Sequence, residues 1–586
     1  MKTCYCTIVI FLLILILSAA ADTNAATLTV TKIEDTADGV CDGDCSLREA
    51  IAAAASGDSI KFSSLFQLPQ TIRLIKGQLV IDKDLRIDGP GSGLLTVSGN
   101  NAGRIFRITA PDTIEISAMR LTEGRLVDIN SIFGGAIYLV GGSLKLLGLV
   151  IDHNFARHTS INPPVVDLGL GGGIYVNDGV LTVTNTRILN NTGPNGGGIY
   201  VNSGSLTLTD SEVSQNIGPG IKLLGSIILN VTGSKIDGNL GRGIEGSGNE
   251  QIFISDSSVS NNKGGGILSM GRTTISDSVI RGNRINGNAA GVDHSGASIL
   301  TVDRCAIIEN RSTLSSAGIR NQSQMYLTNS TVSGNQTGSD PSTAKGGGIR
   351  NYAQMTVTNS TIAHNEASGS GGGIHSEAGA ATKLSNTLIA NNSGNLNSPD
   401  FFGTATSEGY NLVRVHSGSS GWSATDLLGQ DPLLAPLGFN GGNTYTYALL
   451  PGSPAINAGS NDLAVDPVTG TPFETDQRGR PRRVGSKGGV VDIGAYEANY
   501  AFQPISLEGR LLTSTGRGIG SARVVLTGSD LTRYAVTNPF GYYRFLDLPA
   551  AATYTITASD KLYSFAVPIV VTTDQDRNDL IFLGTF

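Results

Sequence analysis

The sequence predicts an all-β protein built around a parallel β-helix, a rod of stacked coils. A glycine followed by Ile or Val recurs every 22 to 30 residues along the middle of the chain. Short runs that alternate apolar and polar residues follow these glycines, and none has a helical period. An asparagine lies three residues after an aliphatic residue in every unit. Repeats of this length, made of strand-like segments, are typical of a solenoid whose units bury their apolar residues by stacking.

Each unit has a part of fixed length and one corner of variable length. The Ile or Val lies 16 to 18 residues before the asparagine, whereas 5 to 20 residues separate that asparagine from the next Ile or Val. We therefore expect one continuous aliphatic core, with loops of different lengths leaving the rod at one edge. The aligned asparagines are expected to form a ladder in which each amide bonds the next. The predicted ladder is Asn154, Asn191, Asn216, Asn239, Asn262, Asn283, Asn310, Asn335, Asn365 and Asn392.

The N-terminus has the features of an export signal, which we assign to residues 1–21. Lys2 precedes an unbroken apolar run over residues 8–17, and the small residues 19–21 offer a cleavage site. An uncleaved anchor helix is the alternative, but the run is short for a bilayer. No later segment is apolar enough to cross a membrane. We therefore expect an exported protein, either extracellular or at the cell surface.

Residues 22–64 are expected to cap the first coil, because an open sheet edge needs cover. Ser46 and Glu49 have the spacing of a capping box, which predicts a short helix at about 46–55. The sequence CSLREAI at 45–51 resembles the N-terminal motif of a bacterial family of exported β-helix proteins. That resemblance agrees with the export signal.

Two cysteines and three aspartates lie just before this helix. In an exported chain Cys41 and Cys45 are expected to form a disulfide. Asp38, Asp42 and Asp44 offer the oxygen ligands that calcium prefers, but their spacing is not that of an EF-hand. A solvated acidic turn is therefore the interpretation we favour.

Over residues 65–400 the repeat resembles the right-handed parallel β-helix proteins. That class includes polysaccharide lyases, bacterial adhesins and many exported proteins without an assigned role. The resemblance implies a right-handed rod. It implies little about function, because function depends on sites that differ between members of one fold.

Residues 401–497 differ in sequence pattern from the repeat units that precede them. They contain DPL at 431–433, NGGNT at 440–444, PGSPAINAG at 451–459, TDQRGRPR at 475–482 and DIGAYE at 492–497. This series is similar to the choice-of-anchor Q domain, which follows β-helices in surface-destined bacterial proteins. Three arginines and three acidic residues predict an ion-paired cap at the C-terminal end of the rod: Arg478, Arg480, Arg482, Asp476, Asp492 and Glu497.

Residues 504–586 are expected to form a small separate domain. Strand-like runs at 505–512 and 522–526 flank a glycine-rich turn, and NPFGYYRF follows at 538–545. These features resemble the carboxypeptidase regulatory-like domain, a transthyretin-like β-sandwich. In that family the domain is an accessory module without catalysis, and nothing before it resembles a metallocarboxypeptidase.

One outward column of the rod could carry chemistry. The residues directly after the Ile or Val include Asp293, Arg320, Arg350 and His375, with Glu377 nearby. A polysaccharide lyase or glycoside hydrolase needs such acids, bases and arginines to bind an acidic sugar and to move a proton. We favour instead a mixed-charge solvated face in which Asp293 and Arg320 pair across coils. The histidines have no metal-ligand spacing, so we predict no metal site and no other cofactor.

The partner we expect is a polysaccharide or another component of a cell surface. A net charge of -7 without a basic block argues against nucleic acid. Loops on a rigid scaffold are where recognition concentrates, and the longest are expected at 155–173 and 336–348. Tyr175 and Tyr200 are neighbours in the stack and could support a sugar ring, although an ordinary cross-coil aromatic pair explains them as well. We predict a non-enzymatic protein of adhesion or glycan binding, with a polysaccharide lyase or glycoside hydrolase as the alternative.

Overall fold

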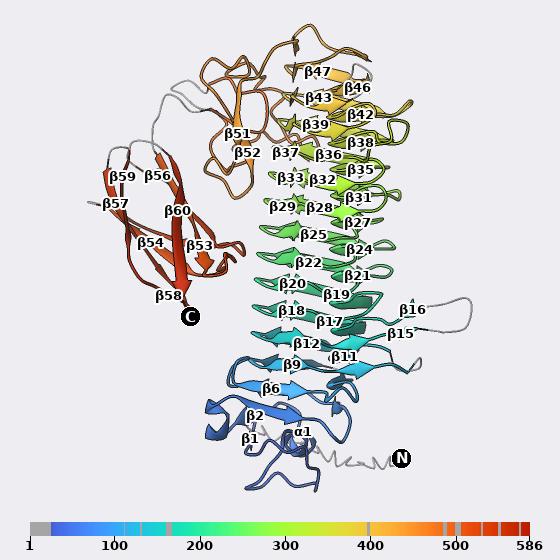
Figure 1. Cartoon of the computed structure of the whole chain (residues 1–586), viewed down its shortest axis with the longest axis vertical. Coiled ribbons are helices and arrows are strands. Elements are labelled where there is room, and N and C mark those ends of the chain that lie inside the picture. The colour runs from blue at the N-terminus through green and yellow to red at the C-terminus, as the bar shows by residue number, and fades with distance from the viewer. Residues whose placement is uncertain are drawn as a thin grey trace, which may run out of the picture.

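The computed structural model describes residues 25–109, 112–128, 132–159, 167–394, 399–483, 489–498, 505–528, 531–548, 552–573 and 576–585. The predicted signal peptide lies outside these residues. A parallel β-solenoid of about 13 turns makes up most of the molecule, and a small β-sandwich follows it (Figure 1). The predicted fold class is therefore confirmed. Within the described ranges no helix is long and apolar enough to span a membrane.

Each coil of the rod contributes one strand to each of three faces, and neighbouring strands within a face are parallel. Face 1 consists of β4 (Leu79–Ile81), β7 (Phe106–Ile108), β11 (Ile137–Val140), β17 (Ile174–Thr184), β19 (Ile199–Thr209), β21 (Ile221–Leu223), β24 (Ile244–Gly246), β27 (Ile267–Ser269), β31 (Val292–His294), β35 (Ile319–Asn321), β38 (Ile349–Asn351), β42 (Ile374–Ser376), β46 (Phe401–Thr404) and β49 (Ser419–Ser420). Face 2 consists of β1 (Thr27–Val30), β2 (Asp58–Phe62), β5 (Leu85–Asp88), β8 (Thr113–Ser117), β12 (Ser143–Leu147), the second halves of β17 and β19, β22 (Ile228–Thr232), β25 (Gln251–Ser255), β28 (Arg272–Ser276), β32 (Ile299–Asp303), β36 (Gln324–Thr328), β39 (Gln354–Thr358), β43 (Ala381–Ser385) and β47 (Thr406–Gly409). Face 3 consists of β3 (Gln70–Arg73), β6 (Leu95–Ser98), β9 (Arg120–Thr122), β13 (Val150–Asp152), β18 (Arg187–Leu189), β20 (Glu212–Ser214), β23 (Lys235–Asp237), β26 (Ser258–Ser260), β29 (Val279–Arg281), β33 (Ala306–Ile308), β37 (Thr331–Ser333), β40 (Thr361–Ala363), β44 (Leu388–Ala390), β48 (Leu412–Val413) and β50 (Leu427–Leu428).

The corner loops connect face 3 of one coil to face 1 of the next. Some contain short strands that pair with each other: β10 (Arg125–Leu126) with β14 (Phe155–Ala156), β15 (His158–Thr159) with β16 (Asp167–Leu168), β30 (Arg284–Ile285) with β34 (Arg311–Ser312), and β41 (Glu366–Ala367) with β45 (Ser393–Gly394). In Figure 1 these loops leave the rod along one side. The aliphatic side chains of all three faces point inward and form one core from Val30 to Val413.

The ten asparagines form an unbroken hydrogen-bonded ladder directly after face 3. The Oδ1 atom of each asparagine accepts hydrogen bonds from the backbone N–H and the Nδ2 group of the asparagine one coil earlier, as Asn262 does from Asn239 at 3.0 and 2.9 Å. Its own Nδ2 also donates to a backbone carbonyl of the earlier coil, Ile236 in this case. The ladder begins at the N–H of Gly124, and its last acceptor is the carboxylate of Asp400.

A second ladder lies between faces 2 and 3. Here a backbone N–H donates to the Ser or Thr hydroxyl of the next coil, as Ser211 does to Ser234 at 3.0 Å. The hydroxyl in turn donates to a carbonyl of its own coil, Thr232 in the case of Ser234. The last acceptor is again a carboxylate, because the N–H and Nδ2 of Asn411 both donate to Asp426.

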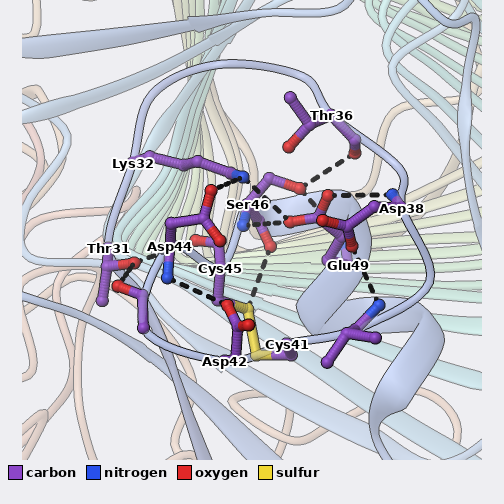
Figure 2. The surroundings of a disulfide bond; sticks show 12 residues. Thr31, Lys32, Thr36, Asp38, Cys41, Asp42, Asp44, Cys45, Ser46 and Glu49 are labelled. Atoms are coloured by element: carbon purple, nitrogen blue, oxygen red, sulfur yellow. Dashed lines mark hydrogen bonds and ion pairs between the residues drawn. A yellow bond between two sulfur atoms is a disulfide. The ribbon is translucent and has the colours of Figure 1, made fainter.

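Helix α1 (Leu47–Ala53) covers the N-terminal end of the rod and buries Leu47, Ala50 and Ile51. Ser46 and Glu49 make both hydrogen bonds of a capping box. Cys41 and Cys45 are joined by a disulfide beside the start of the helix (Figure 2). Burial opposes ionisation of Glu49, but hydrogen bonds from the backbone of Ser46 and Asp38 lower its pKa to about 2. The cap therefore contains a buried carboxylate that is ionised at neutral pH.

Residues 431–483 and 489–498, here called the flank, lie along face 3 instead of covering the end of the rod. They include β51 (Leu434–Gly438) and β52 (Thr446–Leu449), next to β33 and β37 in Figure 1. Gln477 in the flank accepts from Thr331 at 2.6 Å and donates to the carbonyl of Cys305 at 3.1 Å. The prediction of a C-terminal cap is therefore wrong in position. At the end of the rod, Trp422 packs edge-on against Phe401.

Two of the predicted contacts between arginines and carboxyl groups are nevertheless present inside the flank, whereas Arg480 makes no ion pair with a described residue. Arg478 contacts Asp476 at 2.6 Å and Arg482 lies 3.6 Å from Glu497, all four side chains being buried. Burial is the main reason why the pKa of Glu497 is raised to about 9, and the neighbouring carboxylate of Asp492 adds to the increase. With Glu497 neutral, two guanidinium groups face the two carboxylates of Asp476 and Asp492. The cluster is then balanced in charge, which is what a buried site requires.

The C-terminal domain is a sandwich of two four-stranded sheets with its own core. Its strands are β53 (Ile505–Thr513), β54 (Arg523–Thr527), β55 (Thr532–Val536), β56 (Tyr542–Leu548), β57 (Ala552–Ser559), β58 (Ser564–Phe565), β59 (Ile569–Thr573) and β60 (Arg577–Thr585). It contacts the flank through Tyr542 and Phe439, whose ring centroids are 4.3 Å apart, and through a hydrogen bond from Arg544 to the Gly441 carbonyl. Figure 1 shows it beside the middle coils of the rod.

Candidate functional site

The outward column that was considered as a catalytic site is in register along face 1. Asp293 pairs with Arg320, Arg320 with Arg350, and Arg350 with His375 in adjacent strands. The side chains form two separate groups. In the first, Asp293 receives two hydrogen bonds from Arg320, at 2.7 and 3.1 Å, and one from Arg242 at 3.3 Å. The cross-coil ion pair expected from the sequence is present, but a second arginine shares its carboxylate.

The second group joins Arg350, Glu377 and His375. Arg350 donates to Glu377 through Nε at 2.8 Å, and the imidazole of His375 lies 3.4 Å from the same carboxylate. Burial opposes ionisation, but the hydrogen bonds from Arg350 lower the pKa of Glu377. Burial also lowers the pKa of His375 to about 4, so the imidazole is neutral at physiological pH. Glu377 is then an ionised carboxylate held by Arg350 and His375 is a neutral imidazole, so neither is poised to donate a proton at neutral pH.

The interpretation of this column as a solvated face is wrong at Asp293 and His375, whereas Arg320 and Arg350 are partly exposed. Asp293 is 3% and His375 is 1% exposed. The corner loops fold over the column and bond to it: Arg242 comes from one loop, and Ser370 of another lies 2.9 Å from Nδ1 of His375. The column therefore anchors the loops, and a polymeric substrate cannot reach Asp293 or His375 without moving them.

Tyr175 and Tyr200 are also buried, at 6% and 5% exposure. Their rings stack with centroids 5.4 Å apart, and Tyr138 and Phe133 pack against Tyr175. The rings are therefore not an open platform for a sugar, and the prediction of a binding role is wrong at these two residues. They form the cross-coil aromatic pair that was the alternative.

The three aspartates near the disulfide are engaged in local contacts. Asp44 pairs with Lys32 at 2.9 Å, and Asp42 accepts from the backbone N–H of Asp44 (Figure 2). Asp38 accepts from the N–H of Val40. Across the described residues, no three His, Cys, Asp or Glu side chains are grouped so that they could hold a metal ion.

An open polar hollow of about 490 Å³ lies on face 3 of the early coils, where the sequence predicted no site. His153 and Glu123 border it, and Arg73 and Arg120 lie alongside. The Nδ1 atom of His153 is 3.0 Å from Asp152, which also receives a bidentate pair of hydrogen bonds from Arg120. A histidine oriented by a carboxylate, beside a second carboxylate and an arginine, is a combination suited to proton transfer.

The sequence contained a signal for this hollow. One coil before Asn154, the ladder position is occupied by Gly124. Glu123 directly precedes Gly124 in the sequence, and His153 directly precedes Asn154. Extending the alignment by one coil would have placed them on neighbouring coils. Because position 124 is a glycine and not an asparagine, the pattern of asparagines begins only at Asn154. The alignment therefore does not include the coil that contains Glu123.

The comparisons with known proteins agree with this architecture. The sequence matches the family described as right handed beta helix region over residues 125–278 and 172–337. Residues 506–582 match the carboxypeptidase regulatory-like domain. No curated protein matches the chain.

One similar solved structure is that of the periplasmic alginate epimerase AlgG. It is 14% identical, and the match covers 65% of this chain and 82% of that chain with a TM-score of 0.30. The chain is thus similar to right-handed β-helix proteins in its rod and to carboxypeptidase regulatory-like domains in its C-terminal sandwich.

Proposed function

We propose that this protein is an exported or cell-surface glycan-binding protein that recognises its ligand through the corner loops and does not cleave it. The observation that carries the proposal is the burial of Asp293 and His375 in the charged column. Asp293 and His375 are enclosed and internally paired, so they hold the loops in place. A rigid rod that fixes a row of polar loops suits recognition more than catalysis.

The loop at 336–348 is the clearest binding element. Residues 339–343 at its tip are exposed and have the sequence SDPST. Asp340 fixes the tip by accepting hydrogen bonds from the N–H and hydroxyl of Ser342 and from the hydroxyl of Thr343. Short polar side chains on a preformed tip can exchange hydrogen bonds with sugar hydroxyls at a small cost in conformational entropy.

Export and surface location are part of the same proposal. The apolar N-terminal segment, the disulfide between Cys41 and Cys45, and the resemblance of 401–497 to the choice-of-anchor Q domain support them. The partner is then a polysaccharide or another component of a cell surface.

Replacing residues 339–343 by five glycines tests the binding role. We expect at least a tenfold loss of apparent affinity on a glycan array, because the replacement removes the polar groups and the ordered tip together. Thermal stability should change little, since these side chains are exposed. Substituting Ser247 and Asn249 by glycine, exposed residues at the corner between faces 1 and 2, is the matched control. Unchanged glycan binding in the loop variant would contradict the proposal.

A second candidate, a polysaccharide lyase or glycoside hydrolase, has one observation in its favour. The hollow bordered by Glu123 and His153 is open, and Asp152 orients the imidazole. Its acids and bases are accessible, unlike those of the buried column.

If the second candidate is right, incubation with acidic polysaccharides gives unsaturated products or new reducing ends. His153→Ala would then lower turnover by about 100-fold or more, the usual contribution of a general acid or base. His364→Ala, a substitution of another histidine outside the hollow, should leave turnover unchanged. We expect no turnover from the unaltered protein, and the proposal of a non-enzymatic role fails if His153-dependent turnover is observed.

A further inference from the structure

A polar groove runs between the rod and the C-terminal sandwich. Two adjoining hollows, of about 570 and 880 Å³, are bordered on one side by the starts of face 3 strands and on the other by the turn between β53 and β54. Volumes of this size suit a small ligand or a few sugar units, and ligand sites occur preferentially where domains meet. The groove is remote from the corner loops, because it lies on face 3 and not at the edge between faces 3 and 1.

The groove carries an excess of positive charge. Its borders contain six basic residues, Arg187, Lys235, Arg510, Arg517, Arg523 and Lys561, and three acidic residues, Asp210, Glu212 and Asp560. Asp560 accepts hydrogen bonds from the backbone N–H groups of Leu562 and Tyr563 in its own turn. This local excess contrasts with the net charge of -7 of the whole chain.

Two arginines share one carboxylate at the centre of the groove. Glu212 on β20 contacts Arg187 of the neighbouring coil at 3.3 Å and also contacts Arg517 of the sandwich. The side chain of Glu212 is 13% exposed, whereas those of Arg187 and Arg517 remain 46% and 42% exposed. One negative charge cannot neutralise two guanidinium groups. Among the described residues Glu212 is the one carboxylate that pairs with either arginine, although Asp210 also borders the groove. The two exposed guanidinium groups therefore give this part of the groove a local excess of positive charge and present N–H groups to it.

Burial lowers the pKa of Arg517, and the neighbouring Arg187 lowers it further. The repulsion between the two guanidinium groups follows from their placement around Glu212. A bound anion would relieve it. Arginine is suited to this task because its planar fork binds a carboxylate through two parallel hydrogen bonds.

We propose that this interdomain groove binds the carboxylate of a uronic acid unit in an acidic glycan, with Arg187 and Arg517 as its ligands. The exposed Leu562 and the half-buried Tyr563 border the groove and offer apolar surface to the sugar ring. The identity of the ligand as a glycan rests on the proposed function, whereas its negative charge rests on the groove alone.

The test measures binding of trigalacturonate and of neutral galactotriose by isothermal titration calorimetry, using the whole mature chain at low ionic strength. We expect trigalacturonate to bind and Arg517→Ala to weaken it at least tenfold, the loss of a charge-assisted hydrogen-bond partner. Arg187→Ala should have a similar effect. Arg272→Ala, which removes an exposed arginine outside the groove, should leave the affinity unchanged.

Glu212→Gln separates ligand binding from simple docking of the sandwich. The substitution keeps the shape of the side chain and removes the charge that competes with the ligand, so we expect several-fold tighter binding of trigalacturonate. If the ion pairs only hold the sandwich in place, Glu212→Gln weakens binding as Arg517→Ala does, and the proposal is overturned. Failure of trigalacturonate to bind, or equal binding of galactotriose, also overturns it. The corner-loop proposal is judged separately, by the variant at 339–343.

Discussion

Replacing Asn262 by alanine is expected to lower the free energy of unfolding by about 3–6 kcal/mol. The side chain accepts two hydrogen bonds from Asn239 and donates to Ile236 and Asn283, all in the interior of the rod. Alanine leaves two buried donors and two acceptors with fewer partners, and each unsatisfied buried group costs about 1–3 kcal/mol. Denaturant titration followed by circular dichroism measures the loss.

Lys263→Ala is the matched control for this prediction. Lys263 follows Asn262 directly and is exposed, so its replacement should change stability by no more than about 0.5 kcal/mol. Because a solenoid can unfold in parts, the midpoint and the slope of each transition must both be compared. A loss below about 1 kcal/mol for Asn262→Ala would mean that water replaces the missing amide, and the ladder would then contribute little to stability.

Arg482→Met is expected to destabilise the flank by about 3–5 kcal/mol, the usual cost of removing one partner from a buried ion pair. Arg482 is fully buried and donates to Asn329 at 2.8 Å and to the carbonyl of Gly494 at 2.9 Å. Asn329 belongs to the rod, so this single side chain links the two parts of the molecule. Methionine fills much of the volume but removes the guanidinium that balances the charge of Asp492, whereas Arg478 still pairs with Asp476.

Limited proteolysis measures this effect directly. In the Arg482→Met protein, cleavage within 431–483 should become faster, whereas the rod should stay resistant. Arg483→Ala is the control, because Arg483 is the next residue and is exposed. Equal cleavage rates in the two variants would show that the flank is held mainly by its apolar contacts.

The rod was predictable from the sequence because its order is local and repeated. The same residue types return at the same place in every coil, so aligning the asparagines also aligns the strands. Ile174 pairs with Ile199 and Tyr175 with Tyr200 in the register that this alignment gives. The stacking of coils then follows from the need to bury one apolar face.

The surroundings of the candidate residues were not predictable in this way. Whether Asp293 is exposed depends on Arg242, which comes from a corner loop two coils away and has no counterpart in the repeat. The place of the flank depends on contacts such as that between Gln477 and Cys305, 172 residues apart. Residues 431–497 contain no repeat unit, so nothing in the sequence indicates which coils they cover.

The two ladders also determine how the rod can change in length. In both ladders each acceptor atom bonds to a donor in the preceding coil. Each ladder ends at a carboxylate, Asp400 or Asp426, which accepts hydrogen bonds but has no side-chain hydrogen to donate to a further coil. A duplicated coil inserted between the ends brings its own Asn and Ser or Thr and restores every bond that it interrupts. Shortening or lengthening the rod by whole coils therefore leaves the last bonds of both ladders intact. Loss of Asp400 or Asp426 instead removes the acceptor for the N–H and Nδ2 groups of Asn392 or Asn411.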